Sequence, residues 1–156
     1  MSRTKKAYKN LGFLNSPAAR TIRIMCEYEE PRQRFEEQGV SDTVVLFGSA
    51  RTLPREIAEQ QLKNAETALS EGSGSEEAVA AARGKLASSR YYEDARELAR
   101  KMTEWSLGRD SERDYLICTG GGPGIMEAGN RGAADVEGGR SVGLGISLPF
   151  EEDVNA

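Results

Sequence analysis

The sequence predicts an α/β fold in which helices flank a parallel β-sheet. Short apolar runs rich in β-branched residues occur at residues 43–47, 115–119 and 141–147. Segments whose apolar residues recur at helical spacing lie between these runs. Strands that alternate with helices in this order are typical of parallel sheets joined by right-handed crossovers.

Each predicted strand has its own pattern. Residues 43–47 form a continuous apolar run before Gly48, which is typical of a strand buried on both faces. Residues 115–119 lead at once into a glycine-rich turn and then a helix over about 124–134. Residues 141–147 contain two glycines, which thin the strand and allow another backbone or a ligand to approach it.

The first crossover, about 65 residues long, is large for such a connection and is predicted to hold an inserted helical hairpin. Its first helix spans 54–69 and ends at the polar, glycine-rich segment 71–75. A second helix follows and is expected to falter near residues 88–89, before a third over 95–105. Their apolar stripes are predicted to face the core.

Residues 1–40 are predicted to form a tail and a helical extension that packs on the domain formed by residues 41–156. Residues 17–29 suit a helix, and Pro31 is expected to restart the pattern as a second short helix that ends at Gln38. The first 25 residues carry basic but no acidic side chains. They could contact nucleic acid or target an organelle, but a solvated terminus is the favoured interpretation.

Composition excludes several classes of function. With 38% apolar and 29% charged residues, the 156-residue chain suits one soluble domain, and its net charge of -4 disfavours a nucleic-acid-binding surface. No run is long and apolar enough for a membrane span. Cys26 and Cys118 form no disulfide or zinc motif, and we expect a cytoplasmic protein without a metal or cofactor. The absence of histidine removes histidine-based triads and metal sites.

The sharpest motif lies where the second strand passes into a helix. It comprises Gly120, Gly121, Gly122, Pro123 and Gly124. Glycines at such a place bring amide groups close to a ligand, and the helix start adds about half a positive charge, so a phosphate fits. The pattern is neither the dinucleotide fingerprint nor a P-loop. A turn that is merely tight is the less favoured alternative.

A second turn ends the first strand and contains Gly48, Ser49 and Arg51. Ligands of open parallel sheets bind beyond the carboxyl ends of the strands, so both turns are predicted to face one crevice. Ser49 could donate a hydrogen bond to phosphate or sugar, and Arg51 could pair with phosphate, with a solvated loop charge as an equal alternative for Arg51. Ser147, after the third strand, is placed at the same edge.

Three residues of the helix after the glycine turn are also considered. Met126 is predicted to form a pocket wall, with a place in the core as the alternative. Glu127 and Arg131 are spaced four residues apart, and we expect them to pair with each other on the helix surface. Together, the strands and turns predict a Rossmann-like nucleotide-binding domain.

Three segments resemble the LOG (LONELY GUY) family, often labelled lysine-decarboxylase-like, and in particular its longer bacterial members. They are Phe-Gly-Ser-Ala-Arg at 47–51, Gly-Gly-Gly-Pro-Gly-Ile-Met-Glu-Ala-Gly-Asn-Arg-Gly-Ala at 120–133, and Gly-Leu-Gly-Ile-Ser-Leu-Pro-Phe-Glu at 143–151. The glycine segment is specific, whereas the other two are weak alone. The similarity covers about residues 40–152, most of the predicted domain.

The resemblance implies hydrolysis of the N-glycosidic bond of a nucleoside 5′-monophosphate, such as a cytokinin riboside monophosphate or AMP, to free base and ribose 5-phosphate. It also implies a homodimer and phosphate and nucleotide contacts at Gly48, Ser49, Arg51, Gly120, Gly121, Gly122, Gly124, Met126 and Ser147. Lysine decarboxylation is not expected, because it requires pyridoxal phosphate and no Schiff-base lysine site is evident.

In the family, a glutamate stabilises the oxocarbenium-like sugar or activates water, with help from an arginine. These groups belong to a Pro-Gly-Gly-x-Gly-Thr-x-x-Glu motif, and to an arginine just before it, that follow the third strand. The sequence up to Ala156 contains neither. We therefore expect an incomplete domain, a truncated product or a piece of a longer protein, with no catalytic residue and no activity alone. The alternative is a non-catalytic nucleotide-binding module, like the related molybdenum-cofactor carriers.

Overall fold

The structure is a computed structural model that describes residues 4–111 and 113–146. The chain divides into two compact units, residues 1–41 and residues 42–156, and each is described by itself. No helix in the described ranges is both long enough and apolar enough to cross a membrane.

The first unit is helical. Two 3₁₀ turns, Ala7–Lys9 and Pro17–Ala19, flank the short helix α1 (Leu11–Leu14), and helix α2 (Arg20–Glu37) follows. Residues 7–14 are thus ordered into turns where the sequence predicted a tail. The prediction that Pro31 starts a new helix was also wrong, because α2 runs through it. No residue of α2 is buried, so water can satisfy the carbonyl that proline leaves unpaired.

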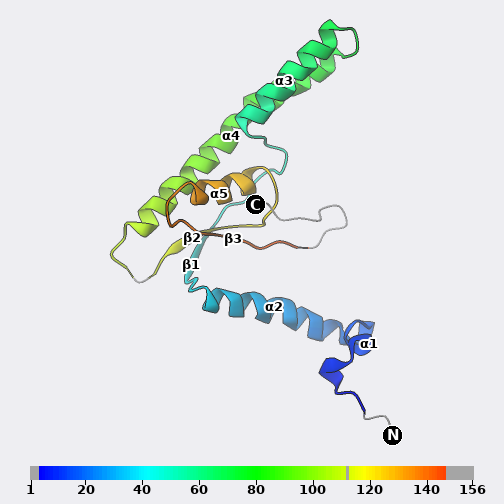
Figure 1. The fold of residues 1–156 in the computed structure, drawn as a ribbon, viewed down its shortest axis with the longest axis vertical. Coiled ribbons are helices and arrows are strands. Elements are labelled where there is room, and N and C mark those ends of the chain that lie inside the picture. The colour runs from blue at the N-terminus through cyan, green and yellow to red at the C-terminus, as the bar shows by residue number, and fades with distance from the viewer. Residues whose placement is uncertain (1–3, 112, 147–156) are drawn as a thin grey trace. The chain divides into compact units, whose positions relative to one another are not determined.

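The second unit is an α/β structure built on a parallel sheet, as predicted (Figure 1). Its strands are β1 (Asp42–Val45), β2 (Tyr115–Thr119) and β3 (Ser141–Gly143), and β2 lies between the other two. Asp42 pairs with Tyr115 at one end of the sheet, and Thr119 pairs with Gly143 at the other.

The two outer strands are shorter than predicted because their shared partner ends first. β2 stops at Thr119, where the glycine turn leads the chain away. The last bonds to β2 run from the Leu46 amide to the Cys118 carbonyl and from the Leu144 amide to the Thr119 carbonyl. A strand without a neighbour has no hydrogen-bond partner for its backbone, so pairing ends there.

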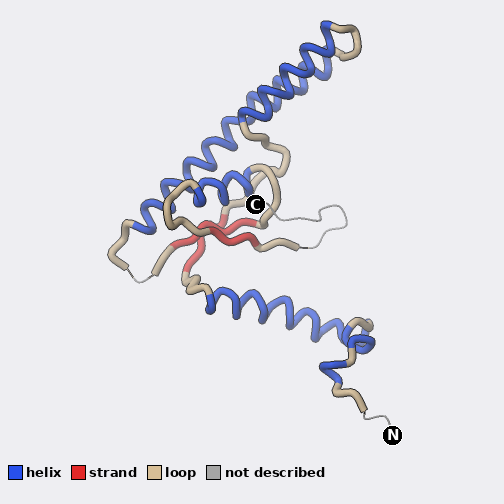
Figure 2. Tube along the Cα trace, viewed as in Figure 1, coloured by secondary structure: helices blue, strands red, loops and turns tan. Residues whose placement is uncertain are grey.

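The long crossover contains the predicted hairpin, which extends beyond the sheet (Figure 2). It consists of α3 (Arg55–Ser70) and the 32-residue α4 (Glu76–Leu107). The predicted interruption near residues 88–89 is wrong, since α4 is continuous there. Ser88 and Ser89 direct their hydroxyls back to the carbonyls of Lys85 and Leu86, so they bond within the helix instead of breaking it.

The core lies between the sheet and two helices, α4 and α5 (Ile125–Ala134). Its centre is formed by Ala99, Ile117 and Ala133, with Val44 and Leu46 packed against them. Because the strand order advances in one direction, right-handed crossovers place both helices on the same face of the sheet.

Strand β1 was predicted to be buried on both faces of the sheet. Val45 is 53% exposed and Phe47 is 78% exposed, so that prediction is wrong. The residues that alternate with them, Val44 and Leu46, face α4 and α5 and are packed into the core. β1 therefore has one packed face, and the side chains of its other face meet solvent.

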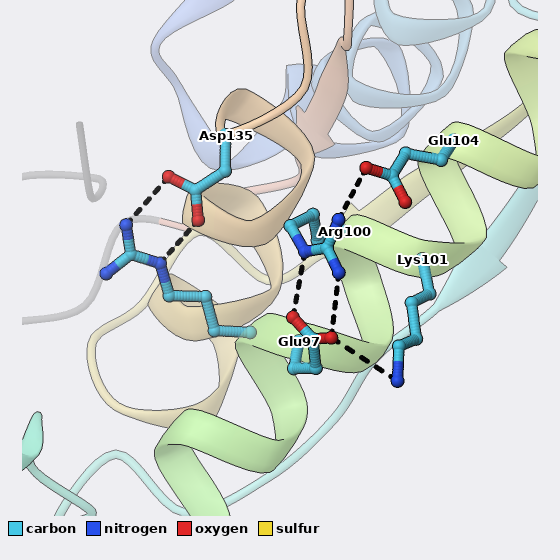
Figure 3. Close-up of polar contacts among 6 residues, drawn as sticks. Glu97, Arg100, Lys101, Glu104 and Asp135 are labelled. Atoms are coloured by element: carbon cyan, nitrogen blue, oxygen red, sulfur yellow. Dashed lines mark hydrogen bonds and ion pairs between the residues drawn. The ribbon is translucent and has the colours of Figure 1, made fainter.

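Helices α4 and α5 are held together by close packing and by an ion pair. A Cβ added to Gly132 would overlap the Arg96 carbonyl oxygen, so α5 approaches the backbone of α4. Next to this contact, Arg96 donates two hydrogen bonds, of 2.6 and 2.7 Å, to the Asp135 carboxylate (Figure 3). The pair connects α4 to the residue that ends α5.

Candidate functional site

Three segments meet where the strands of the sheet end at their carboxyl edge. They are the turn after β1 (residues 48–51), the glycine turn between β2 and α5 (residues 120–124), and the end of β3 at Gly143. Parallel strands place such segments side by side, and this edge is where open α/β sheets bind ligands. The predicted juxtaposition of the two turns is therefore present.

The two turns are joined by backbone contacts. The Ile125 amide donates a 3.1 Å hydrogen bond to the Ser49 carbonyl. Gly124 has a φ of 75°, and a Cβ there would overlap the Ser49 carbonyl oxygen, while a Cβ at Gly48 would overlap Ile125. Glycine at 48 and 124 is thus required for close approach, and at 124 also for a left-handed conformation.

Thr119, the last residue of β2, is hydrogen-bonded to the glycine turn through its side chain. The Thr119 hydroxyl accepts a 3.0 Å hydrogen bond from the Gly121 amide and donates one of 3.1 Å to the Asn130 side-chain oxygen on α5. Thr119 is 2% exposed. One buried hydroxyl therefore connects the strand, the turn and the helix.

Met126 folds back onto the glycine turn. A Cβ at Gly120 would lie 3.1 Å from the Met126 sulfur, and one at Gly122 would lie 2.6 Å from its terminal methyl. The thioether thus fills the space that the absent side chains leave. Met126 contacts the turn itself, and this arrangement is compatible with the predicted pocket wall.

The end of β3 closes the other side of the turn. A Cβ at Gly143 would lie 3.4 Å from the Gly121 Cα and 3.9 Å from the Asn130 amide nitrogen. Gly121 is buried, whereas Gly143 is exposed. The turn is therefore packed between β3 on one side and the Gly48–Ser49 turn on the other.

The remaining predicted site residues are placed as follows. The Ser49 hydroxyl accepts a 3.1 Å hydrogen bond from the Arg51 amide, which shapes the second turn. Ser49 and Arg51 are both exposed. Ser147 lies outside the described residues, so its predicted contact is not tested.

The start of α5 sets the local electrostatics. Glu127 and Arg131 form the predicted ion pair, with 2.9 Å between Oε1 and Nη2, which confirms their pairing on the helix surface. The first amide groups of a helix have no intrahelical acceptor and carry partial positive charge. The Ser49 carbonyl accepts the hydrogen bond of the first of these amides, that of Ile125.

Two buried titratable side chains lie near this edge. Burial, and next the nearby Glu127 carboxylate, raises the pKa of the Tyr92 hydroxyl above its ordinary value. Within the described ranges that hydroxyl has no hydrogen-bond partner. Burial also raises the pKa of the Cys118 thiol, so Cys118 stays protonated at neutral pH and is unsuited to act as a nucleophile.

The side chains around the turn offer groups that donate or accept hydrogen bonds. Thr119, Asn130 and Ser49 supply hydroxyl and amide groups, and Met126 supplies a thioether. The sequence analysis gave neither Thr119 nor Asn130 a role in the site, because the hydrogen bond that joins them forms only in the folded unit. A hydroxyl directly before a run of glycines was the available signal. Within the described residues no cluster of acidic or cysteine side chains suits a metal ion.

No family model matches the chain, and no curated protein sequence is significantly similar to it.

Proposed function

We propose that this chain binds the 5′-phosphate of a nucleoside monophosphate on the glycine turn at residues 120–124. The observation that carries the proposal is the junction of the two turns through the Ile125–Ser49 hydrogen bond and the close contact of Gly124 with Ser49. This junction places a hydroxyl residue and the start of a helix at one sheet edge. Phosphates are bound at such places by amide groups and the helix dipole.

The proposed reaction is the one that the LOG resemblance implies. Water adds its oxygen to the anomeric carbon of the ribose, the bond from that carbon to the base nitrogen breaks, and the base leaves with a proton. We assign this chain the phosphate-binding portion of such a hydrolase. No residue of the chain is assigned a catalytic role, since the family's glutamate-bearing motif does not occur in the sequence.

The test is calorimetric titration of the full chain with AMP, with adenosine and ribose 5-phosphate as matched ligands. We expect AMP and ribose 5-phosphate to bind and adenosine to bind much more weakly, because the proposed contacts are to phosphate. Adenine release is assayed on the same samples, and none is expected. Equal binding of AMP and adenosine would contradict the phosphate site.

A pair of variants connects binding to the turn. Thr119→Val removes the hydroxyl that holds Gly121 and Asn130, and we expect AMP affinity to fall about tenfold, the effect of losing one buried hydrogen-bonding group. Thr119→Ser keeps the hydroxyl and should bind nearly as the parent chain does. If the two variants bind AMP equally, the hydroxyl does not organise the site.

The second candidate function is a non-catalytic carrier of a nucleotide-like cofactor on the same edge. It is favoured by the character of the side chains around the turn, which suit binding and not proton transfer. The same titration with a pyranopterin nucleotide in place of AMP distinguishes the carrier from the hydrolase. Tighter binding of the pyranopterin nucleotide than of AMP would favour the carrier.

A further inference from the structure

One buried side chain of the second unit carries a polar group that nothing in the fold uses. Tyr92 of α4 is 0% exposed, and within the described residues its hydroxyl has no hydrogen-bond partner. Buried polar groups normally have one, because a hydroxyl taken out of water without a partner costs free energy. The apolar ring is enough to fill the space, and phenylalanine would fill it equally well. The hydroxyl therefore points to a role beyond packing.

The packing of α4 against α5 places Tyr92 opposite the first turn of α5. A Cβ at Gly132 would overlap the Arg96 carbonyl oxygen, and a Cβ at Gly139 would lie 3.1 Å from the Thr103 side chain. The second contact lies further along both segments than the first, so the two run in the same direction. Tyr92 is one helical turn before Arg96 and therefore faces the residues one turn before Gly132, which form the first turn of α5.

Two charged side chains of α5 lie close to this hydroxyl. Burial, and next the Glu127 carboxylate, raises the pKa of the Tyr92 hydroxyl, whereas Arg131 acts on it in the opposite direction. Charges have such effects over short distances, so both groups lie near the hydroxyl. Glu127 and Arg131 are bound to each other, with 2.9 Å between Oε1 and Nη2. The carboxylate nearest to Tyr92 is therefore engaged by an arginine.

A phosphate on the glycine turn changes the balance of charge on these side chains. Glu127 lies in the first turn of α5, directly after residues 120–124. The negative phosphate repels its carboxylate and attracts the Arg131 guanidinium. The Arg131 side chain is 48% exposed, so it has room to turn, whereas that of Glu127 is 21% exposed. Side chains on a helix lean toward its amino end, which directs Arg131 toward the turn, and arginine binds phosphate through two parallel hydrogen bonds.

We propose that phosphate binding exchanges the partners of Glu127: Arg131 turns from the carboxylate to the phosphate, and the Tyr92 hydroxyl then donates a hydrogen bond to Glu127. This exchange rests on the phosphate site proposed above and adds Arg131 to its ligands. Tyr92 is a positioning residue, since it acts through Glu127 and does not touch the nucleotide. Its hydroxyl is buried in place before the ligand arrives and gains an acceptor when the ligand binds.

Calorimetric titration of the full chain with AMP and with ribose 5-phosphate tests the exchange. Tyr92→Phe removes only the hydroxyl, and the affinity for both ligands should fall about tenfold, the effect of losing one hydrogen bond to a charged group. Without ligand, this variant should unfold at the same urea concentration as the parent chain or at a higher one, because the hydroxyl has no partner to lose. Tyr91→Phe is the matched control. It removes the hydroxyl of the neighbouring, exposed tyrosine and should bind both ligands as the parent does.

A double-mutant cycle tests whether Tyr92 acts through Glu127. Glu127→Ala removes the acceptor, so adding Tyr92→Phe in that background should not weaken AMP binding further. Arg131→Ala should weaken AMP and ribose 5-phosphate by the same factor, because the proposed contact is to the phosphate that both ligands carry. Additive effects of the Tyr92 and Glu127 substitutions would overturn the exchange.

Nuclear magnetic resonance follows the hydroxyl itself. In a chain labelled with carbon-13 at the tyrosine Cζ position, the Tyr92 signal is the one that Tyr92→Phe removes. AMP and ribose 5-phosphate should both shift this signal, because the hydroxyl gains a carboxylate acceptor, whereas adenosine should leave it in place. In Glu127→Ala, AMP should not shift it.

Failure of this exchange and failure of the phosphate site give different results. If the parent chain binds neither AMP nor ribose 5-phosphate, the phosphate site is wrong and the exchange is overturned with it. If the parent binds both ligands while Tyr92→Phe binds them equally well, or the Tyr92 signal does not move, the phosphate site stands and only the exchange is overturned.

Discussion

Gly124 lies at the junction of the two turns, with a φ of 75°, and a Cβ built on it would lie 2.2 Å from the Ser49 carbonyl oxygen. Two separate constraints act on this residue. The left-handed backbone disfavours any side chain, and the neighbouring turn leaves no space for one. Gly138 has the same φ, but nothing lies within 4 Å of where its Cβ would be. Comparing the two positions therefore distinguishes the cost of a left-handed backbone, which both share, from the cost of placing a side chain where there is no space, which applies only to Gly124.

We predict that Gly124→Ala lowers the free energy of unfolding by about 2 kcal/mol more than Gly138→Ala does, because only the first substitution pushes the two turns apart. Gly138→Ala should cost about 1 kcal/mol, the price of a left-handed alanine. Urea unfolding measures both values. Gly124→Ala should also abolish AMP binding, whereas Gly138→Ala should leave it unchanged. Equal unfolding costs would show that the turns can separate freely.

At the scale of whole elements, the unit depends on how closely α4 and α5 approach. Gly132 allows that approach, since a Cβ there would overlap the backbone of Arg96 and lie 2.8 Å from the Ala99 Cβ. Gly84, on the outer part of α4, has nothing within 4 Å of its Cβ position. Both glycines are inside helices, where alanine is otherwise the better residue.

The same substitution at these two positions is therefore expected to have opposite effects. Gly132→Ala should lower the free energy of unfolding by about 1–3 kcal/mol through overpacking between α4 and α5. Gly84→Ala should raise it by up to about 1 kcal/mol through helix propensity. Thermal and urea unfolding give both signs. A stabilising Gly132→Ala would mean that the helices can move apart without cost.

For the whole molecule, acid should weaken the folded state through two carboxylates held by arginines on α4. A hydrogen bond from Arg100, with Lys101 beside it, lowers the pKa of Glu97 to about 2 from its ordinary 4.5. Arg96 lowers the pKa of Asp135 below its ordinary 3.8 (Figure 3). Both values are lower in the folded chain than in the unfolded chain. The stability that these groups contribute is therefore present above the unfolded pKa and lost as the pH falls through the folded pKa.

We predict that the parent chain is more stable than Asp135→Asn at pH 7 and that the difference disappears below the ordinary carboxyl range. For Glu97→Gln the difference should fade between pH 4.5 and about 2. Urea midpoints measured across this pH range test both variants. Asp110→Asn, an exposed position on the loop after α4, is the control and should track the parent chain at every pH. A difference that persists undiminished in acid would show that charge is not its cause.

Much of the secondary structure was predictable from local patterns. The strand at 115–119, the hairpin and the glycine turn each depend on residues close in sequence, and all were predicted within a few positions. The errors occurred where a neighbour decides the outcome. Ser88 and Ser89 could have ended a helix, but each hydroxyl donates a hydrogen bond to a backbone carbonyl of the same helix. Pro31 remained inside α2 because that helix is exposed.

The sequence by itself determined the parallel α/β class, the position of the glycine turn and the Glu127–Arg131 pair, because periodicity, glycine conformation and helical spacing act over a few residues. Only the tertiary structure decided the contact of Gly124 with Ser49, the Thr119–Asn130 bond and the exposure of Val45. These join residues that lie far apart in the chain, or depend on which face of the sheet the helices cover. Such pairings follow from strand order and packing, which no local pattern contains.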